Sequence, residues 1–363
     1  MSKIKVINKN SILIGNHSFA FWGFAVLMLL SSCTKKTEVS SEQSATAVTA
    51  NTTGKVKIGF ILATLQEERY VKDKAAFEAK AAELGAEVVF ASANNSEQEQ
   101  LSKVENILSQ GVKVLVIQPV NSKAASSFVN SAHKDNVKVI AYDRVINDAP
   151  LDLYVTQDSC KVGKLQAEAA LKATNSKGNF VILKGEEGHS VANEITRCVQ
   201  EVLAQAKDVK VVLTQAHAGW SADLAMKTIE NALTVNKNNI AAILANNSGM
   251  ANGAVQALAS QKLTGKVFVA GADADLTAIK NIVAGKQQFE VLKAIEPLAH
   301  AAAEAAVKLA KGEVPTTEGS VELGGGFSAP VVNTPVFPVD KDSIESQIIA
   351  TGFHKKEDVY GVR

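Results

Sequence analysis

The chain has 363 residues, of which 46% are hydrophobic and 21% charged, and its formal net charge is +1. This length favours two domains over one, and the composition allows well-filled cores rather than global disorder. Without the first 32 residues, the chain holds 35 basic and 37 acidic residues, a net charge of −2. A nearly neutral body gives no reason to expect a nucleic-acid partner, because such a partner normally requires a basic face.

The N-terminus has the features of an export signal. Three lysines and no acidic residue precede or accompany an apolar run, Phe19–Leu30. The run is shorter than the roughly 20 residues of a membrane-spanning helix, so residues 1–32 are predicted to be a signal peptide. Two serines stand directly before Cys33, an order that resembles the bacterial lipobox and implies cleavage before Cys33 and a lipid on its thiol. An ordinary secretory signal that happens to contain a cysteine remains the alternative.

The segment that follows Cys33 is predicted to be a flexible tether. Residues 33–54 are rich in Ser, Thr and Ala and show no apolar period. A lipid on Cys33 would hold the folded part at a membrane surface without spanning the membrane.

From Lys55 onward, short apolar runs alternate with segments of helical period. The first set of expected strands is Val56–Leu62, Glu87–Ala91, Val112–Pro119 and Val137–Tyr142, and the helices between them are Tyr70–Leu84, Ser96–Leu108 and Ser122–His133. Ser96 and Glu99 have the spacing of a capping box at the start of their helix. Strands that alternate with helices of this length predict a parallel sheet with helices on both faces.

A second set of strands and helices repeats this architecture without a sequence repeat of fixed period. Its expected strands are Phe180–Leu183, Val209–Leu213, Ile240–Leu244, Val267–Ala270 and Glu290–Leu292, and its helices are Val162–Leu171, Asn193–Ala206, Ala222–Leu233, Ala251–Ser260 and Pro297–Lys311. The fold class is therefore α/β, with two doubly wound parallel sheets.

Polar side chains gather where the expected strands end. In open α/β sheets, ligands bind beyond the carboxyl ends of the strands. The polar residues at these ends are Arg69, Asp143, Arg144, Asn246, Asn247, Asp273, Asp275 and Lys293. Each by itself is compatible with a solvated loop or a helix cap, and Asp273 and Asp275 could simply cap a helix that begins near Leu276. Together they indicate a polar cleft.

These residue types suit a sugar. A sugar hydroxyl both donates and accepts, and among the side chains Asp accepts, Arg and Lys donate, and Asn does both. Aromatic rings cover the apolar face of a pyranose, and the candidates are Tyr70, which adjoins Arg69, and Trp220, the single Trp after the signal. The alternative for Trp220 is an ordinary core or surface residue.

Several stretches of the sequence match the pattern of a known protein family. The matching stretches are Lys57-Ile58-Gly59, Glu68-Arg69, Gln118-Pro119 to Asn121, Ala141 to Asp148 (AYDRVIND), Gly219-Trp220, Glu230 to Thr234 (ENALT), Asp273 to Leu276 (DADL), Lys293 and Gly352 to Lys355 (GFHK). From Lys55 to about Lys356 the chain resembles the D-xylose-binding branch of the type I periplasmic binding proteins of ABC sugar transporters. The AYDR-x-IND and DADL runs are fairly specific to that branch.

The resemblance implies two lobes joined by a three-strand hinge, with the sugar between them. Residues 55–156 plus 294–328 are expected to form the N-terminal lobe, and residues 157–293 plus 329–350 the C-terminal lobe, with hinges near Thr156, Lys293 and Ser328. Closure of the lobes would create the surface that a membrane permease reads.

The resemblance also implies which residues bind the sugar. The residues that match hydroxyl ligands of the family are Arg69, Asp143, Arg144, Asn246, Asp273 and Lys293. Tyr70 stands where the family often has Trp, and Trp220 matches a family Trp. The family carries an Asp and an Asn after the strand equivalent to Phe180–Leu183, where this chain has Ser190 and Ala192; Asn193 could supply one amide if the loop shifts. Because of this departure, the sugar class is better supported than the named sugar.

The resulting hypothesis is a substrate-binding lipoprotein of a sugar ABC importer, with D-xylose as the expected ligand. We expect a monomer with no catalytic residue, cofactor or metal, which faces the periplasm or cell exterior, contacts the membrane only through its lipid and works with ABC permease subunits. The alternatives are a sensory protein that presents sugar to a chemoreceptor or kinase, and a binder of glucose or ribose. An enzyme of the same plan is disfavoured. A repressor is disfavoured too, because residues 1–54 contain no helix-turn-helix.

Cys160 and Cys198 both fall in the expected second lobe. An exported protein can oxidise such a pair to a disulfide, and two buried free thiols are the alternative. No CxxC or clustered His accompanies them, so a metal site is not expected.

Overall fold

The structure is a computed structural model that describes residues 55–361. The predicted signal peptide (1–32), Cys33 and the predicted tether (33–54) lie outside the described residues. Within residues 55–361, every helix is too short or too polar to cross a bilayer.

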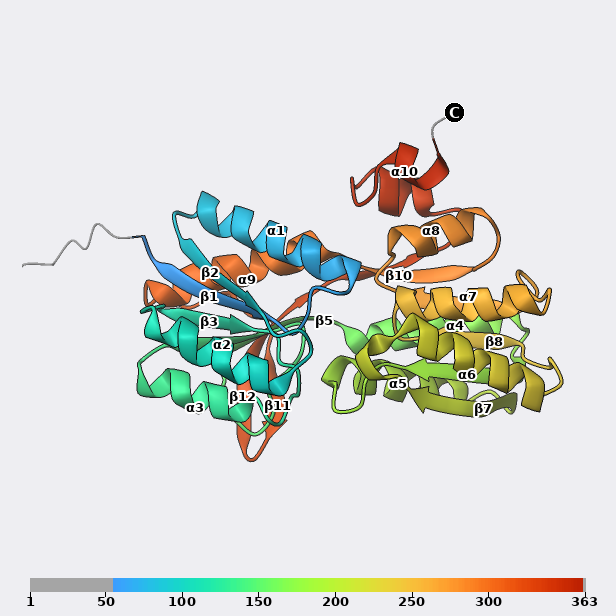
Figure 1. Ribbon diagram of the computed structural model, residues 1–363, viewed down its shortest axis with the longest axis horizontal. Helices are drawn as coiled ribbons and strands as arrows, with labels where there is room; N and C mark the ends of the chain where they lie inside the picture. Colours follow the sequence, from blue (N-terminus) through green and yellow to red (C-terminus); the bar gives the residue numbers. More distant parts are fainter. Residues whose placement is uncertain (1–54, 362–363) are drawn as a thin grey trace, which may run out of the picture. The chain divides into compact units, whose positions relative to one another are not determined.

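The first sheet contains seven strands in the order β11-β12-β5-β4-β3-β1-β2 (Figure 1). Its strands are β1 (Lys57–Leu62), β2 (Glu87–Ser92), β3 (Val114–Ile117), β4 (Lys138–Tyr142), β5 (Leu153–Gln157), β11 (Ser320–Gly324) and β12 (Phe327–Thr334). All neighbours are parallel except β11, which is antiparallel to β12. Residues of the central strand β3 read VLVI and are all buried, as expected for a parallel strand covered on both faces.

Two pairs of helices cover the faces of this sheet. The helices are α1 (Glu68–Glu83), α2 (Glu97–Ser109), α3 (Ser126–Lys134) and α9 (Ile295–Ala310). Phe77 of α1 and Leu298 of α9 belong to one core cluster, while α2 and α3 contribute to the cluster on the other face. The Ser96 side chain caps α2 by accepting a hydrogen bond from the Glu99 amide at 3.2 Å, in agreement with the capping signal in the sequence.

The second sheet contains six strands in the order β13-β10-β9-β8-β6-β7. Its strands are β6 (Lys177–Lys184), β7 (Asp208–Ala216), β8 (Ala242–Ala245), β9 (Phe268–Ala272), β10 (Phe289–Lys293) and β13 (Val336–Val339). Only β13 is antiparallel to its neighbour, β10. Each sheet thus has a parallel centre and one antiparallel pair at an edge.

The helices of the second lobe pack in close pairs. They are α4 (Ser159–Ala173), α5 (Ser190–Leu203), α6 (Ala222–Val235), α7 (Ser248–Ser260) and α8 (Leu276–Val283), with the short α10 (Lys356–Tyr360), a 3₁₀ turn at Ala218–Trp220 and a π turn at Glu345–Ile349. A Cβ at Gly163 of α4 would lie 2.3 Å from the Ile195 carbonyl oxygen of α5, and one at Gly253 of α7 would lie 2.2 Å from the Ala222 carbonyl oxygen of α6. Glycine at these two positions lets each helix pair approach closely.

The chain passes between the two sheets three times. It leaves the first sheet after Gln157, returns after Lys293 at the end of β10, and leaves it again after Thr334 at the end of β12. The first two passages lie close to the hinges expected near Thr156 and Lys293. The third differs from the one expected near Ser328, because β12 continues beside β5 through Thr334.

By the sheet to which they belong, residues 55–157 and 294–334 group with the first sheet, and residues 158–293 and 335–361 with the second. The expected boundary between residues 328 and 329 fell inside β12. The sequence pattern also missed β5, β11, β12 and β13 as strands, since their sequences have neither a long apolar run nor a clear alternation. The largest shifts at helix starts are at Ser126 (expected 122), Ser159 (expected 162), Ser190 (expected 193) and Ser248 (expected 251).

Candidate functional site

Two aspartates occupy equivalent places at the carboxyl ends of the two sheets. Asp143 directly follows β4, and its amide donates to the Val155 carbonyl oxygen of β5 at 2.8 Å; Asp273 directly follows β9, and its amide donates to the Val291 carbonyl oxygen of β10 at 2.9 Å. Both have positive φ, 61° and 97°, which non-glycine residues seldom adopt. Strained backbone of this kind gathers at functional sites, where the surrounding structure holds it in place.

Arg69 joins the two aspartates across the lobes. It lies in the first turn of α1 with 2% of its surface exposed. Its guanidinium lies 3.4 Å from a carboxylate oxygen of Asp143 and 3.4 Å from one of Asp273, and its Nε lies 3.3 Å from Asp73. These distances exceed the 2.7–2.9 Å or so that is usual for charge-assisted hydrogen bonds, so the guanidinium keeps donor capacity for a further acceptor.

The carboxylates around Arg69 are also held from behind. Asp143 accepts from the Gln118 side-chain amide at 3.0 Å, and Asp73 accepts a short hydrogen bond from the Tyr142 hydroxyl. Burial raises the pKa of Asp73 to about 6 in spite of the Arg69 charge. Burial would also raise the pKa of Asp143, but Arg69, Lys293 and Arg144 hold that pKa below its ordinary value. Asp143 therefore stays an ionised acceptor near neutral pH.

Lys293 and Arg144 add two more buried cations. The Lys293 ammonium, at the end of β10, lies 2.9 Å from the Asp273 carboxylate. Arg144 donates to the Pro119 carbonyl oxygen at 3.2 Å and to the Tyr70 hydroxyl at 3.1 Å, and its Nε is buried without a partner among the described residues. The Tyr70 ring packs 5.1 Å from the Arg69 guanidinium carbon and 5.8 Å from that of Arg144.

The second lobe contributes buried donors that lack partners. The Asn246 side-chain oxygen, after β8, accepts from the Gly185 amide at 3.0 Å and from the Thr196 hydroxyl at 3.1 Å. Its amide nitrogen, the Trp220 indole N–H and both ring nitrogens of His189 are buried with no hydrogen-bond partner within residues 55–361. The His189 and Trp220 rings meet edge to face at 4.7 Å.

His189 belongs to the same cluster as the charged groups. Burial lowers its pKa well below the ordinary value, and the nearby charges of Arg144, Lys293 and Arg69 lower it further. The imidazole is therefore neutral and offers one donor and one acceptor. An unpaired polar group buried in this way costs about 1–3 kcal/mol, so the cluster is suited to a ligand that supplies hydrogen-bond partners.

Most of the residues singled out in the sequence come together here. The members are Arg69, Tyr70, Asp143, Arg144, Trp220, Asn246, Asp273 and Lys293, all of which are buried. Asn193 is the exception, because it lies exposed on α5, which already begins at Ser190. Asn247, the neighbour of Asn246, is occupied as the cap of α7, where it accepts from the Met250 amide at 2.9 Å.

The sequence pattern missed His189, although it stands in the loop after β6, and the strand-end rule that found the others applies to it. Ser190 makes a different contribution: its hydroxyl accepts from the Val145 amide of the first lobe at 3.1 Å. The position where the family has a polar ligand thus holds a direct contact between the lobes.

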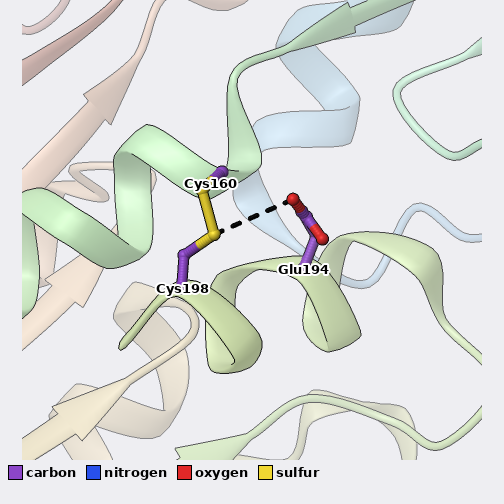
Figure 2. A group of neighbouring side chains, drawn as sticks. All are labelled: Cys160, Glu194 and Cys198. Atoms are coloured by element: carbon purple, nitrogen blue, oxygen red, sulfur yellow. Dashed lines mark hydrogen bonds between the residues drawn. A yellow bond between two sulfur atoms is a disulfide. The ribbon is translucent and has the colours of Figure 1, made fainter. Parts of the chain in front are cut away.

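Cys160 and Cys198 form a disulfide between α4 and α5, with a Cα–Cα distance of 5.2 Å. The structure thereby settles the alternative that the sequence left open. Figure 2 shows the bridge with Glu194 beside it, 3.8 Å from the Cys198 sulfur. Disulfide sulfurs carry neither a proton nor the thiolate charge that metal binding requires, so this trio offers a metal ion a single carboxylate.

Known proteins resemble this chain in sequence and in fold. Residues 58–314 match the model of the periplasmic binding protein domain. The D-xylose-binding periplasmic protein of Haemophilus influenzae is 42% identical over 310 residues, covering 84% of this chain and 92% of that protein, and its Escherichia coli counterpart is 41% identical over 307 residues with the same coverage. A carbohydrate transporter solute-binding protein from Chloroflexus aurantiacus, solved in complex with D-glucose, is 26% identical with a TM-score of 0.77, covering 84% of this chain and 98% of that one.

Proposed function

The chain belongs to the periplasmic binding protein family, and from this membership we propose that it is the sugar-binding component of an ABC importer, with D-xylose as its ligand. The observation that carries the proposal is the buried cluster at the carboxyl ends of both sheets. Arg69, Asp143 and Asp273 tie the lobes together there, and Asn246, Trp220 and His189 leave polar atoms unpaired.

The chemistry of this cluster fits a small polyhydroxyl ligand. Each sugar hydroxyl can donate to a carboxylate and accept from an arginine, lysine, amide or indole N–H, so one ligand can satisfy charged groups and unpaired donors together. Because groups of both lobes would bind the same molecule, the sugar favours the closed arrangement and shifts the population toward it.

D-xylose is favoured over other sugars by relationship rather than by geometry. Both D-xylose-binding relatives exceed 40% identity, whereas the relative solved with D-glucose is 26% identical. Ser190 and Ala192 stand where the family carries polar residues, so one or two hydroxyl contacts differ from the family pattern. His189, directly before α5, would supply one of the replacements.

The same family membership supports a role in transport without catalysis. The permease subunits in the membrane would recognise the protein when its lobes are closed. We place the protein outside the cytoplasmic membrane, because both D-xylose-binding relatives are named periplasmic proteins. A lipid on Cys33 and a monomeric state complete the proposal.

Calorimetric titration tests the ligand. The mature protein is unfolded and refolded to remove carried-over sugar, and D-xylose, D-glucose and D-ribose are titrated separately. One-to-one binding of D-xylose with clearly weaker binding of the others is the expected result. Preference for another sugar would overturn the named ligand and assign the change to the Ser190–Asn193 loop. No heat with any of the three would overturn the sugar-binding role.

Two substitutions test the site. Arg144→Ala and Asp273→Ala should each abolish sugar binding while the protein stays folded, because each removes a charged group from the buried cluster. Arg197→Ala is the control, since that arginine lies outside the cluster, is half exposed and forms ion pairs with glutamates of its own helix. Unchanged affinity in both site variants would place the sugar elsewhere.

A further inference from the structure

A glutamate outside the cluster supports the Asp273 loop from behind. Glu290 lies on β10 with no exposed surface, and one carboxyl oxygen, Oε2, lies 3.1 Å from the Ala274 amide and 2.9 Å from the Ser248 hydroxyl oxygen. The other oxygen accepts from the Gln287 side-chain amide at 2.6 Å. Gly271 on β9 makes room for this carboxyl, since a Cβ there would lie 2.0 Å from it.

Ser248 connects Glu290 to the loop residues on both sides of Asp273. The hydroxyl oxygen of Ser248, at the start of α7, lies 2.8 Å from the Ala272 carbonyl oxygen and accepts from the Asp275 amide at 3.1 Å. Asp273 and Ala274 both have positive φ, 97° and 58°, so the loop needs such fixing. These bonds hold the backbone on either side of Asp273.

Counting hydrogens determines the protonation state that these distances require. Ser248 has one hydroxyl hydrogen, and two oxygens lie within hydrogen-bond distance of it, Ala272 O and Glu290 Oε2. If Glu290 were ionised, only one of the two contacts could contain a hydrogen, and the other would bring two lone pairs together. A proton on Glu290 Oε2 resolves the conflict: Glu290 donates to Ser248, Ser248 donates to Ala272, and the Asp275 and Ala274 amides donate to Ser248 and Glu290.

The charges around Glu290 agree with this assignment. Burial raises the pKa of Glu290 to about 8, and the Asp273 carboxylate adds to that rise. Asp275, in the same loop, also faces Glu290, and burial raises its pKa well above the ordinary value. Lys293 pairs with Asp273 at 2.9 Å, while His354, from the C-terminal segment, contacts the Ala274 carbonyl oxygen at 2.8 Å.

We propose that Glu290 acts as a neutral, hydrogen-donating carboxylic acid that positions Asp273 for sugar binding through Ser248 and the Ala274 amide. It is a positioning residue, because none of its atoms belongs to the proposed sugar contacts. The role in binding rests on the proposed function, whereas the protonation state does not.

The protonation state is tested without any sugar. Infrared spectra of the ligand-free protein at about pH 7 are compared between the wild type and Glu290→Gln, with Glu230→Gln, an exposed glutamate on α6, as the control. The carbonyl absorption of protonated carboxyls should lose one component in Glu290→Gln and keep all of its components in Glu230→Gln. An unchanged band in both variants would overturn the proposal, whatever sugar the protein binds.

The positioning role is tested by affinity as a function of pH. Above about pH 8, ionisation of Glu290 places a negative charge beside Asp273 and breaks the hydrogen-bond chain from Glu290 through Ser248 to Ala272. The D-xylose affinity of the wild type should therefore fall about tenfold by pH 9.5 or so. Glu290→Gln keeps a neutral donor but loses the acceptor for Ala274, so it should bind about threefold more weakly at neutral pH and show no such fall.

A parallel pH profile for wild type and Glu290→Gln would overturn the positioning role. Ser248→Ala provides a second variant should Glu290→Gln fail to fold. It removes the relay and should weaken binding about tenfold at neutral pH, and unchanged affinity would contradict the proposal. A wild type that binds none of the sugars would refute the proposed function and leave the infrared result to decide the state of Glu290.

Discussion

The two lobes supply the site in different ways. Most polar groups of the first lobe are paired with one another, Arg69 with Asp73 and Asp143, and Arg144 with Tyr70, although the Arg144 Nε is buried without a partner among the described residues. In the second lobe, His189, Trp220 and Asn246 bury polar atoms that find no partner in residues 55–361. Asp273 and Lys293 extend this network of ion pairs to the second sheet, because Asp273 pairs with both Arg69 and Lys293.

This difference indicates a division of labour. The first lobe is preorganised, so its groups lose little freedom when a ligand arrives. The unpaired donors of the second lobe each cost about 1–3 kcal/mol when buried, and a hydroxylated ligand would offset this cost. Closure of the second lobe is therefore the step that should depend most on the sugar.

The largest effect is expected from Arg69→Ala. The substitution leaves three buried carboxylates facing one another, so we expect the free energy of unfolding to fall by about 3–5 kcal/mol and sugar binding to be lost. Denaturant unfolding and calorimetry measure the two effects. Arg197→Ala, with exposed partners, should change stability by less than about 1 kcal/mol. Equal effects of the two substitutions would contradict the importance given to the first-lobe network.

The disulfide should stabilise the second lobe, whose buried polar groups contribute less to stability than the paired groups of the first lobe. Replacing both Cys160 and Cys198 by Ser opens a loop with a sequence separation of 38 residues. Chain entropy predicts a loss of about 2–4 kcal/mol in the free energy of unfolding. Sugar affinity at neutral pH should change little, because neither sulfur belongs to the cluster. A stability loss below about 0.5 kcal/mol would show that the packing of α4 on α5 suffices.

His189→Leu should change affinity and stability in opposite directions. The ring makes no hydrogen bond to any group of residues 55–361, so Leu should raise the free energy of unfolding by about 1 kcal/mol and weaken D-xylose binding about tenfold. His217→Leu is the matched control, since that buried ring contacts the Lys184 carbonyl oxygen and the Thr228 hydroxyl. It should lose about 1–3 kcal/mol of stability and keep most of its affinity.

The same variant changes the response to acid. The pKa of His189 in the folded protein lies well below its ordinary value, while the unfolded chain takes up a proton below about pH 6.5. The unfolded state then binds more protons, so acidification destabilises the wild type, by up to about 1.4 kcal/mol per pH unit from this group. Urea unfolding at about pH 7.5 and pH 5 should show less acid sensitivity in His189→Leu, and equal sensitivity would contradict burial of a neutral imidazole.

The smallest effect concerns the rim where the lobes meet. Lys72 on α1 pairs with Glu68 at 3.0 Å and lies 4.3 Å from the Phe353 ring of the other lobe, and Glu68 accepts from the Leu276 amide at 3.4 Å. Lys72→Ala should weaken sugar binding about threefold by removing a contact made only on closure. Lys74→Ala is matched, because Lys74 contacts Glu78 and the Phe90 ring within one lobe. Equal affinities of the two variants would exclude a closure contact at Lys72.

The sequence predicts those parts of the fold and site that have a strong local signal. Apolar runs in the sequence predict the buried parallel strands. Asp143, Asp273 and Lys293 are predicted as site residues because ligands bind beyond the carboxyl ends of such strands. The same rule predicts Arg69, and Trp220 is predicted as an aromatic ring for the apolar face of the sugar; the family resemblance supports both. These residues lie far apart along the chain, but parallel strands bring their carboxyl ends to one edge.

The remainder depends on tertiary contacts that leave no local pattern. β12 and β13 are recognised only by the strands beside which they lie, so the third passage was placed too early. The family resemblance favours Asn193 only if the loop before it shifts by a residue, but α5 already begins at Ser190 and Asn193 lies exposed on it. Glu290 reads as an ordinary charged strand residue, and only its contacts with Ser248 and Ala274 set it apart.

The third passage of the chain has a consequence for the order of assembly. The last strands to be synthesised complete both sheets at once: β12 inserts between β11 and β5, and β13 closes the edge beside β10. Neither lobe is a contiguous stretch, so a growing chain cannot finish one before starting the other. A protein truncated before Phe327 would leave two unfinished sheets with open edges, and both halves of the molecule therefore reach their native state together.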